Sequence, residues 1–171
     1  MHLDQLLEGL QLKSVDRAGW RRIGILAPES VAAHSWGISW LALHLCPPEL
    51  SLERALAIAA LHDLPEVRVG DITPHDGISK VDKLRMESEA ATALFAARPE
   101  LLALWRDYAE QASPEARFVR DLDKLDMALQ ALLYAQDGHD TAQFVASAFR
   151  SAQTPRVKAL IDEVQRRLDR R

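Results

Sequence analysis

Residues 57–76 of the sequence read AIAALHDLPEVRVGDITPHD. The opening run of alanine, isoleucine and leucine has the composition of a buried helix. Directly after this run come His62 and Asp63, and Glu66 and Asp71 follow closely. An ionised carboxylate among apolar residues is costly unless a cation or several hydrogen-bond donors face it. The stretch therefore predicts a buried helix that leads into a polar cluster, and the rest of the sequence must indicate what that cluster faces.

The composition is that of a soluble globular protein. The chain has 171 residues, of which 48% are hydrophobic and 27% are charged, and we expect a single domain over residues 1–171. The net charge of −4 argues against a protein that binds nucleic acid, because contact with a phosphate backbone requires a basic face. No run approaches the roughly 18 apolar residues that a membrane-spanning helix needs, so we expect no membrane partner.

The single cysteine and the N-terminus indicate the compartment. Cys46 alone can form no internal disulfide bond and no multi-cysteine metal site, which fits a reducing environment. The N-terminal sequence MHLDQLLEGLQLK is amphipathic and contains acidic residues, so it does not resemble a signal peptide. We therefore expect a cytoplasmic protein.

Capping residues divide the chain into helices. A serine precedes several apolar stretches and is expected to cap a helix at Ser30, Ser51, Ser79 and Ser113. The predicted helices cover residues 3–10, 31–45, 52–63, 80–97, 99–108, 114–137, 141–150 and 154–168. Strand signals are essentially absent and the apolar spacing never settles into heptads, so we predict an all-α fold, a compact helical bundle. Aromatic side chains at helical spacings are expected in its core: Trp36, Trp40, Trp105 and Phe118.

The dipeptide His62-Asp63 alone leaves two interpretations open. In the first, the two residues cap the end of a helix and the acidic residues beyond them are solvated. In the second, they are adjacent ligands of a divalent metal ion. If the helix continues through Pro65, Glu66 shares a face with both, because helix positions three and four apart lie on the same side.

Two further segments favour the metal ion. His34 lies among apolar and small residues in VAAHSWGISWLAL, and Asp123 lies in the apolar part of FVRDLDKLDMALQALL. Together with His62 and Asp63, they make two imidazoles and two carboxylates on three separate helices. Such a nitrogen and oxygen set suits manganese, cobalt, iron, zinc or magnesium. Four protein ligands on an octahedral ion leave two open positions, which is typical of a catalytic site.

The pattern H…HD…D made by these residues resembles the signature of the HD-domain metal-dependent phosphohydrolases. Longer motifs are similar to the 5′-deoxynucleotidase subgroup, which includes small HD-domain-containing proteins of eukaryotes. These motifs are RAGW at 17–20, PESVAAHS at 28–35, LHDLPEVRVGDITP at 61–74, ISKVDKLRMESEA at 78–90 and FVRDLDKLDMALQA at 118–131. The resemblance covers a motif-bearing core of about residues 12–134, followed by C-terminal helices within residues 141–170.

The resemblance implies a role for each residue at a matching position. The metal ligands would be His34, His62, Asp63 and Asp123. Glu66 would be the catalytic acid/base, and Asp71 would orient the attacking water. Arg17 would bind phosphate, and Trp20 would crowd the sugar where a ribose 2′-hydroxyl would sit. Here Ala18 and Gly19 separate the arginine from the tryptophan, whereas the two are adjacent in some bacterial members. Trp20 has an equally simple interpretation as a core aromatic.

The implied activity is metal-dependent hydrolysis of deoxyribonucleoside 5′-monophosphates to deoxynucleoside and phosphate, by a homodimer. The alternative within the family is a phosphohydrolase that acts on another nucleotide or phosphorylated metabolite. A metal- or nucleotide-binding module without activity would need no proton shuttle such as Glu66 and Asp71. A diiron oxygenase would need further histidines near the His62-Asp63 pair, and the nearest, His75, lies in a predicted turn.

Overall fold

Helices follow one another along the whole of the described chain, which comprises residues 3–170 of the computed structural model. They are α1 (Leu3–Leu10), the 3₁₀ helix η1 (Gln11–Ser14), α2 (Ala18–Arg22), α3 (Val31–Leu45), α4 (Leu52–Leu61), α5 (Glu66–Val69), α6 (Lys80–Leu94), α7 (Pro99–Glu110), α8 (Pro114–Gln136), α9 (Ala142–Ser151) and α10 (Pro155–Asp169). Within residues 3–170 the extended backbone pairs only at an isolated antiparallel bridge between Asp16 and Ser30. The predicted all-α fold is confirmed.

The serine caps form as the sequence predicts. The hydroxyl oxygens of Ser30, Ser51, Ser79 and Ser113 each accept a hydrogen bond from the backbone N–H three residues later, at the starts of α3, α4, α6 and α8. Each bond satisfies one of the N–H groups that a helix leaves without an internal partner at its first turn. These starts fix where α3, α4 and α8 enter the bundle.

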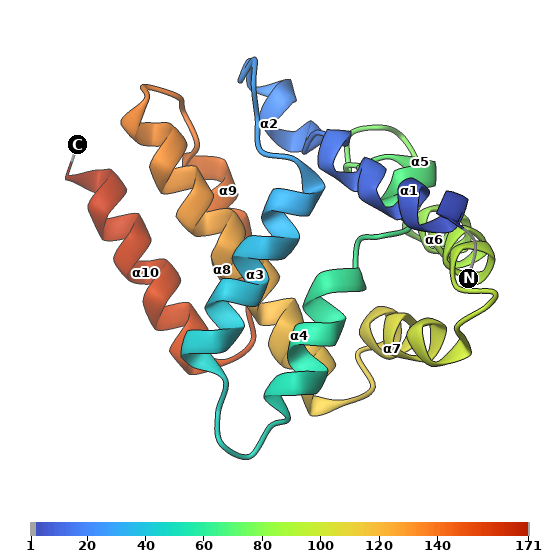
Figure 1. The fold of residues 1–171 in the computed structure, drawn as a ribbon. Helices are drawn as coiled ribbons and strands as arrows, with labels where there is room; N and C mark the ends of the chain where they lie inside the picture. The colour runs from blue at the N-terminus through green and yellow to red at the C-terminus, as the bar shows by residue number, and fades with distance from the viewer. Residues whose placement is uncertain (1–2, 171) are drawn as a thin grey trace.

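The helices form two groups (Figure 1), and their buried apolar side chains form two clusters. The larger cluster lies among α3, α4, α8, α9 and α10, and its fully buried members include Ile38, Ile58, Leu122 and Ile161. The smaller cluster joins the end of α4 to α6 and α7 through Leu61, Ala91, Phe95 and Trp105. His62 directly follows Leu61 of the smaller cluster, whereas His34 and Asp123 lie on helices of the larger one. The polar site therefore lies between the two clusters.

The prediction of a core position is wrong for two of the four aromatic residues. Trp105 and Phe118 are buried, but Trp36 is 69% exposed and Trp40 is 51% exposed. Their indoles stack on one another on the outer side of α3, with ring centroids 6.3 Å apart. Helical spacing puts them on a shared face, but α3 also carries the buried residues Ile38 and Ala42, and those residues face the core.

The first helix lies on the surface of the protein. The leucines of α1 follow the expected helical stripe, yet none of its residues is buried. No helix within residues 3–170 combines the length and the apolar character that crossing a membrane would require.

Candidate functional site

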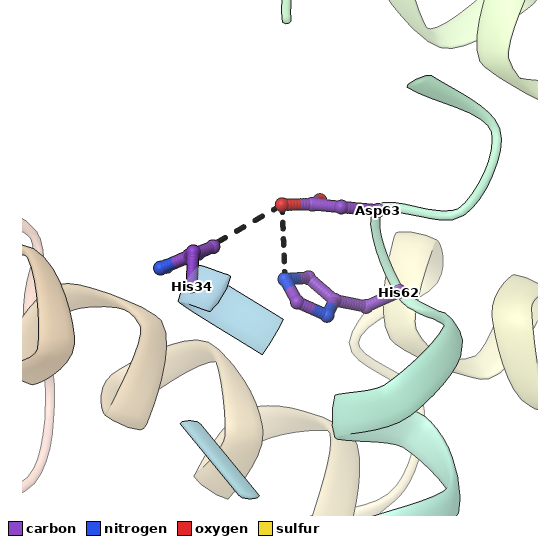
Figure 2. A group of neighbouring side chains, drawn as sticks. All are labelled: His34, His62 and Asp63. Atoms are coloured by element: carbon purple, nitrogen blue, oxygen red, sulfur yellow. Dashed lines mark ion pairs between the residues drawn. The ribbon is translucent and has the colours of Figure 1, made fainter. Parts of the chain in front are cut away.

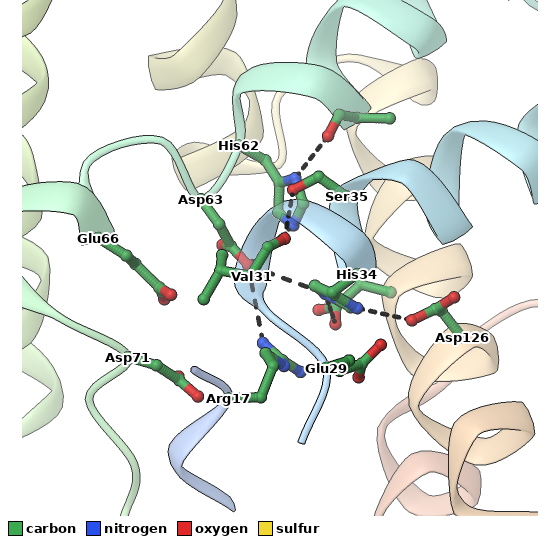
Figure 3. Close-up of polar contacts among 12 residues, drawn as sticks. Arg17, Glu29, Val31, His34, Ser35, His62, Asp63, Glu66, Asp71 and Asp126 are labelled. Carbon is green, nitrogen blue, oxygen red and sulfur yellow. Dashed lines mark hydrogen bonds and ion pairs between the residues drawn. The ribbon is translucent and has the colours of Figure 1, made fainter. Parts of the chain in front are cut away.

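The helix before the His62-Asp63 pair ends earlier than the sequence predicts. α4 ends at Leu61, residues 62–65 form a turn, and α5 begins at Glu66. The condition of one helix running through Pro65 is therefore not met. The turn, and not a common helical face, brings His62, Asp63 and Glu66 to the same region (Figure 3).

His62 is held in one orientation by its surroundings. Its Nδ1 lies 2.9 Å from the carbonyl oxygen of Ala59, so Nδ1 carries the proton and donates it. The Trp105 indole donates a hydrogen bond to the His62 carbonyl at 3.0 Å, and the ring of Tyr108 packs edge-on against the imidazole. The lone pair of His62 therefore lies on Nε2.

His34 presents the matching nitrogen from α3. Its ring is fully buried, and its Nδ1 lies 2.7 Å from Oδ2 of Asp126. Nε2 of His34 and Nε2 of His62 lie 3.8 Å and 3.1 Å from Oδ2 of Asp63 (Figure 2). Neither nitrogen has a hydrogen-bond partner among the described residues. Two buried ring nitrogens and a carboxylate thus face a common point, within 4.8 Å of one another.

Asp123 reaches this point from α8. Its Oδ1 lies 3.4 Å from Nε2 of His34. Its Oδ2 accepts hydrogen bonds from Lys124 at 2.7 Å and from the Tyr108 hydroxyl at 3.4 Å. Asp123 therefore contacts His34, next to the cluster that His34, His62 and Asp63 form.

The donor set fits a divalent cation. Burial and Arg17 oppose a proton on His34, yet the nearby Asp123 and Asp126 outweigh them and raise the pKa of His34 to about 9. Burial likewise opposes charge on Asp63, but His62, His34 and Arg17 hold the pKa of this carboxyl below its usual range. Positive charge is thus favoured beside the two nitrogens, and a cation on unpartnered nitrogen and oxygen donors provides it.

A second group of possible ligands is less suitable. Glu29, His34 and Asp126 also offer ligand atoms within 4.8 Å of one another. In this group His34 would have to bind through Nδ1, which already donates to Asp126. Glu29 accepts a hydrogen bond from the Trp20 indole at 2.9 Å. We therefore regard Glu29 and Asp126 as residues around the site and not as ligands.

The segment that carries Arg17 is fastened across the start of α3. The Arg17 N–H donates to the Glu29 carbonyl at 3.1 Å, and the Val31 N–H donates to the Val15 carbonyl at 2.8 Å. Nη1 of Arg17 lies 3.8 Å from Oδ2 of Asp63, on the side facing the His34 and Asp63 cluster (Figure 3). Burial disfavours the guanidinium charge, but Asp71 and Asp63 outweigh this and raise the pKa of Arg17 above its usual range.

Asp71, the residue expected to orient water, makes a structural contact. Its Oδ2 accepts a hydrogen bond from the Ala18 N–H at 2.8 Å, directly after Arg17. The bond ties the loop after α5 to the start of α2. Asp71 thus lies beside the Arg17 segment and opposite Glu66 (Figure 3).

Glu66 has the surroundings of a carboxyl that retains its proton. It is only 3% exposed, and its Oε2 has no hydrogen-bond partner among residues 3–170. Burial raises the pKa of Glu66 well above its ordinary value, and the charges of Asp63 and Asp71 raise it further. A neutral carboxyl group beside a cluster of charges can act as a general acid.

Lys83 is a site residue that sequence reasoning missed. From α6 its Nζ donates to the Ile72 carbonyl at 2.8 Å and lies 3.9 Å from Glu66 and 3.4 Å from Glu87. Lys83 therefore connects the loop bearing Asp71 to the helix bearing Glu66. The ISKVDKLRMESEA motif contains this lysine, but nothing in its spacing separates Lys83 from the exposed Lys80.

Trp20 lies in the core behind this site. It is 2% exposed, and its ring packs on Phe144 and Tyr134 at centroid distances of 4.1 Å and 5.2 Å. Its indole N–H donates to Glu29, which itself follows Pro28 at the start of the PESVAAHS motif. The packing is that of a core aromatic, and its role toward a sugar stays a prediction.

Comparison with known proteins places the chain in a family. The HD domain family model matches residues 10–165. The 5′-deoxynucleotidase hdd1 of Schizosaccharomyces pombe is 37% identical over 166 residues, which cover 90% of this chain and 83% of that protein. The 5′-deoxynucleotidase HDDC2 of Homo sapiens is 35% identical over 163 residues, covering 91% of this chain and 80% of that protein.

A solved structure has a similar fold and a related sequence. The crystal structure of the PH0347 protein from Pyrococcus horikoshii superposes with a TM-score of 0.81 at 32% identity, covering 97% of this chain and 99% of that one. Sequence and fold thus agree over nearly the whole length of both proteins. With the family match over residues 10–165 and the His34, His62-Asp63 and Asp123 constellation, this chain belongs to the HD-domain family.

Proposed function

We propose that the protein is a metal-dependent 5′-deoxynucleotidase, which hydrolyses deoxyribonucleoside 5′-monophosphates to a deoxynucleoside and inorganic phosphate. The observation that carries the proposal is the pair of buried nitrogens, His34 Nε2 and His62 Nε2, that face Asp63 without a hydrogen-bond partner among the described residues. The relatives hdd1 and HDDC2, both 5′-deoxynucleotidases, support the same reaction.

The proposed ligands of the metal ion are His34, His62, Asp63 and Asp123. A set of two imidazoles and two carboxylates accepts cobalt, manganese, magnesium, iron or zinc. A divalent ion held there supplies Lewis acidity, which polarises a phosphoryl oxygen and lowers the pKa of water. Nδ1 of His34 contacts the Asp126 carboxylate, and Nδ1 of His62 contacts the Ala59 carbonyl. These contacts keep the two Nε2 atoms available for the metal ion.

Arg17 is the proposed phosphate-binding residue. Its guanidinium offers paired N–H donors in the geometry that phosphate oxygens accept. The 3.8 Å from its Nη1 to Asp63 exceeds a hydrogen bond, so this ion pair leaves the donor free to turn toward a substrate. The backbone bond from Arg17 to Glu29 holds the segment in place as the phosphate arrives.

Glu66 and Asp71 are the proposed proton-transfer residues. Water attacks phosphorus, a new P–O bond forms, and the water proton passes to Asp71. The bond between phosphorus and the 5′-oxygen breaks, and the proton held by Glu66 passes to the departing 5′-oxygen. The raised pKa of Glu66 suits the acid, and the Ala18 N–H on Oδ2 of Asp71 leaves Oδ1 to receive the proton.

We also propose that the enzyme works as a homodimer in the cytoplasm. The exposed indoles of Trp36 and Trp40 and the exposed Leu43 on α3 offer an apolar contact area that a second copy could cover. The lone Cys46 suits a reducing compartment. Light scattering after gel filtration measures the mass in solution, and a mass of one chain at micromolar concentration would rule out the dimer.

Substrate profiling tests the proposed activity directly. Phosphate release would be measured with deoxyribonucleoside 5′-monophosphates, their ribonucleoside counterparts, deoxyribonucleoside 3′-monophosphates and p-nitrophenyl phosphate. We expect release mainly from the deoxy 5′ series. A preference for ribonucleotides or for the simple ester would favour another phosphohydrolase of the same family. No release from any compound would contradict the proposal.

The proposed role of Trp20 in sugar selection makes a separate prediction. Trp20→Leu removes the indole that is proposed to crowd the 2′ position, so the ratio of deoxy to ribo activity should fall, from on the order of 100 toward 1. Trp40→Leu, the same change at an exposed site, should leave the ratio unaltered, and thermal melting would show that both variants are folded. An unaltered ratio in Trp20→Leu would mean that the indole serves only the core contacts with Phe144 and Tyr134.

A further inference from the structure

A glycine inside α3 marks an unusually close approach between two helices. Gly37 lies in the middle of the helix, where glycine costs stability relative to alanine. A Cβ at this position would lie 2.1 Å from Oδ1 of Asp126 and 3.0 Å from its Cγ. Such contacts are impossible for a real side chain. The space beside Gly37 is therefore occupied by the carboxylate of Asp126, which comes from α8.

The same carboxylate contacts a proposed metal ligand. Oδ2 of Asp126 lies 2.7 Å from Nδ1 of His34, one helical turn before Gly37 (Figure 3). Because a carboxylate accepts, Nδ1 carries a proton, and Nε2 is the nitrogen left to bind a metal ion. Nε2 faces Asp63 and Asp123 at 3.8 Å and 3.4 Å. Asp126 thus selects both the tautomer and the orientation that a metal ligand requires.

The other acidic neighbour of His34 has a different partner. Glu29 accepts the indole proton of Trp20 at 2.9 Å, and its backbone N–H donates to the Tyr134 hydroxyl at 2.7 Å. Asp126 is the carboxylate with a hydrogen bond to His34 among the described residues. Its path to Nδ1 passes through the volume that any side chain on residue 37 would fill.

We infer that Asp126 is a positioning residue for the metal ligand His34, and that residue 37 is glycine because the Asp126 carboxylate must pass it to reach Nδ1. Asp126 touches neither substrate nor metal in this arrangement and acts through His34. The inference rests on the metal site of the proposed function, but it does not depend on which phosphate ester is the substrate.

Metal affinity is the readout that a merely structural contact would not change. The protein would be stripped with EDTA, and its affinity for cobalt would be measured by competition with a chromophoric chelator. Asp126→Asn keeps the shape and removes the charge behind the imidazole, so we expect cobalt affinity to fall about 10- to 100-fold. Gly37→Ala pushes the carboxylate away and should lower the affinity in the same direction.

Asp121 provides the matched control on the same helix. It is a buried carboxylate of α8 that accepts the backbone N–H groups of Gln153 and Thr154 at 2.8 Å and 2.7 Å, at the start of α10. Asp121→Asn should lower the melting temperature and leave cobalt affinity unchanged. The double variant Gly37→Ala/Asp126→Asn should bind cobalt no more weakly than the weaker single variant, because both changes remove one contact.

The outcomes separate this inference from the proposed function. If wild-type protein binds cobalt and Asp126→Asn binds it equally well, the inference is overturned and the metal site stands. If Asp121→Asn loses as much affinity as Asp126→Asn, the effect is one of general stability and the inference is again overturned. If wild-type protein binds no divalent metal, the proposed function fails and the inference fails with it.

Discussion

Asp63→Ala is expected to abolish phosphate release and metal binding together. Oδ2 of Asp63 is the atom toward which the nitrogens of His62 and His34 and the guanidinium of Arg17 converge, at 3.1 Å, 3.8 Å and 3.8 Å. Without it, two imidazoles and Asp123 remain, and the carboxylate that neutralises a bound cation between them is lost. A metal ion contributes several kcal/mol to the transition state, so kcat/KM should fall about a thousandfold or more.

The loss should not come from unfolding. Removal of Asp63 takes a counter-charge from His62, His34 and Arg17 but also relieves the repulsion of Glu66, and these two effects oppose each other. We therefore expect the metal-free variant to melt close to metal-free wild type in a calorimetric scan. Asp162→Ala, on the exposed side of α10, is the control and should keep full activity. Normal cobalt affinity in Asp63→Ala would contradict the assignment of Asp63 as a ligand.

Glu66→Gln is expected to lower kcat about 10²- to 10⁴-fold, the usual contribution of a positioned acid or base, while metal affinity stays near that of wild type. Glutamine has nearly the same shape but no proton that the 5′-oxygen can take. Because kcat falls and the phosphate and metal contacts remain, KM should change little. Steady-state kinetics and the cobalt competition titration measure the two effects separately.

The pH profile of the same variant gives an independent check. Burial raises the pKa of Glu66, so its carboxyl keeps the proton to a higher pH than an ordinary glutamate and loses it as the pH rises through the raised value. Activity that needs this proton should fall on that alkaline side in wild type, and the limb should be missing in Glu66→Gln. Glu87→Gln, which removes another carboxylate beside Lys83, is the control. An identical alkaline limb in Glu66→Gln would contradict the role of general acid.

Local signals explain why much of the fold could be predicted from the sequence. Each capping serine acts within three residues, so Ser30 and Ser113 predict the starts of α3 and α8 without knowledge of the rest of the structure. The end of α4 is different. Apolar periodicity continues past Leu61, but the chain turns at residues 62–65 and begins α5 at Glu66. The pattern of apolar and polar residues does not specify where the chain leaves the helix for this turn. The expectation of a single domain stays a prediction.

The exposed indoles show a second limit. Trp36 and Trp40 share a face of α3 with four-residue spacing, and a large aromatic stripe usually faces the core. α3 has apolar residues on more than one side, and the buried side is the one that carries His34 and Ile38. Which face of such a helix is buried depends on the helices packed against it. The sequence does not specify this without the fold.

In the candidate site, the sequence indicates the proposed ligands but not the residues packed around them. The sequence singles out His34, His62, Asp63 and Asp123 as candidate ligands because each is a ligand-type residue in apolar surroundings. Asp126 and Lys83 could not be identified, since their roles come from the approach of α8 to α3 and of α6 to the loop after α5. The one available signal was Gly37, a glycine without a local reason inside a helix.

Metal reconstitution is the most direct test of the proposed function, because it asks whether one ion at the His62-Asp63 site makes the protein a phosphatase. EDTA-stripped protein would receive cobalt, manganese, magnesium, iron or zinc in increasing amounts, while bound metal and phosphate release from a deoxyribonucleoside 5′-monophosphate are recorded together. We expect no release without metal and activity that rises in proportion to binding up to one ion per chain. Full activity in the stripped protein, or one bound ion with no release, would contradict it.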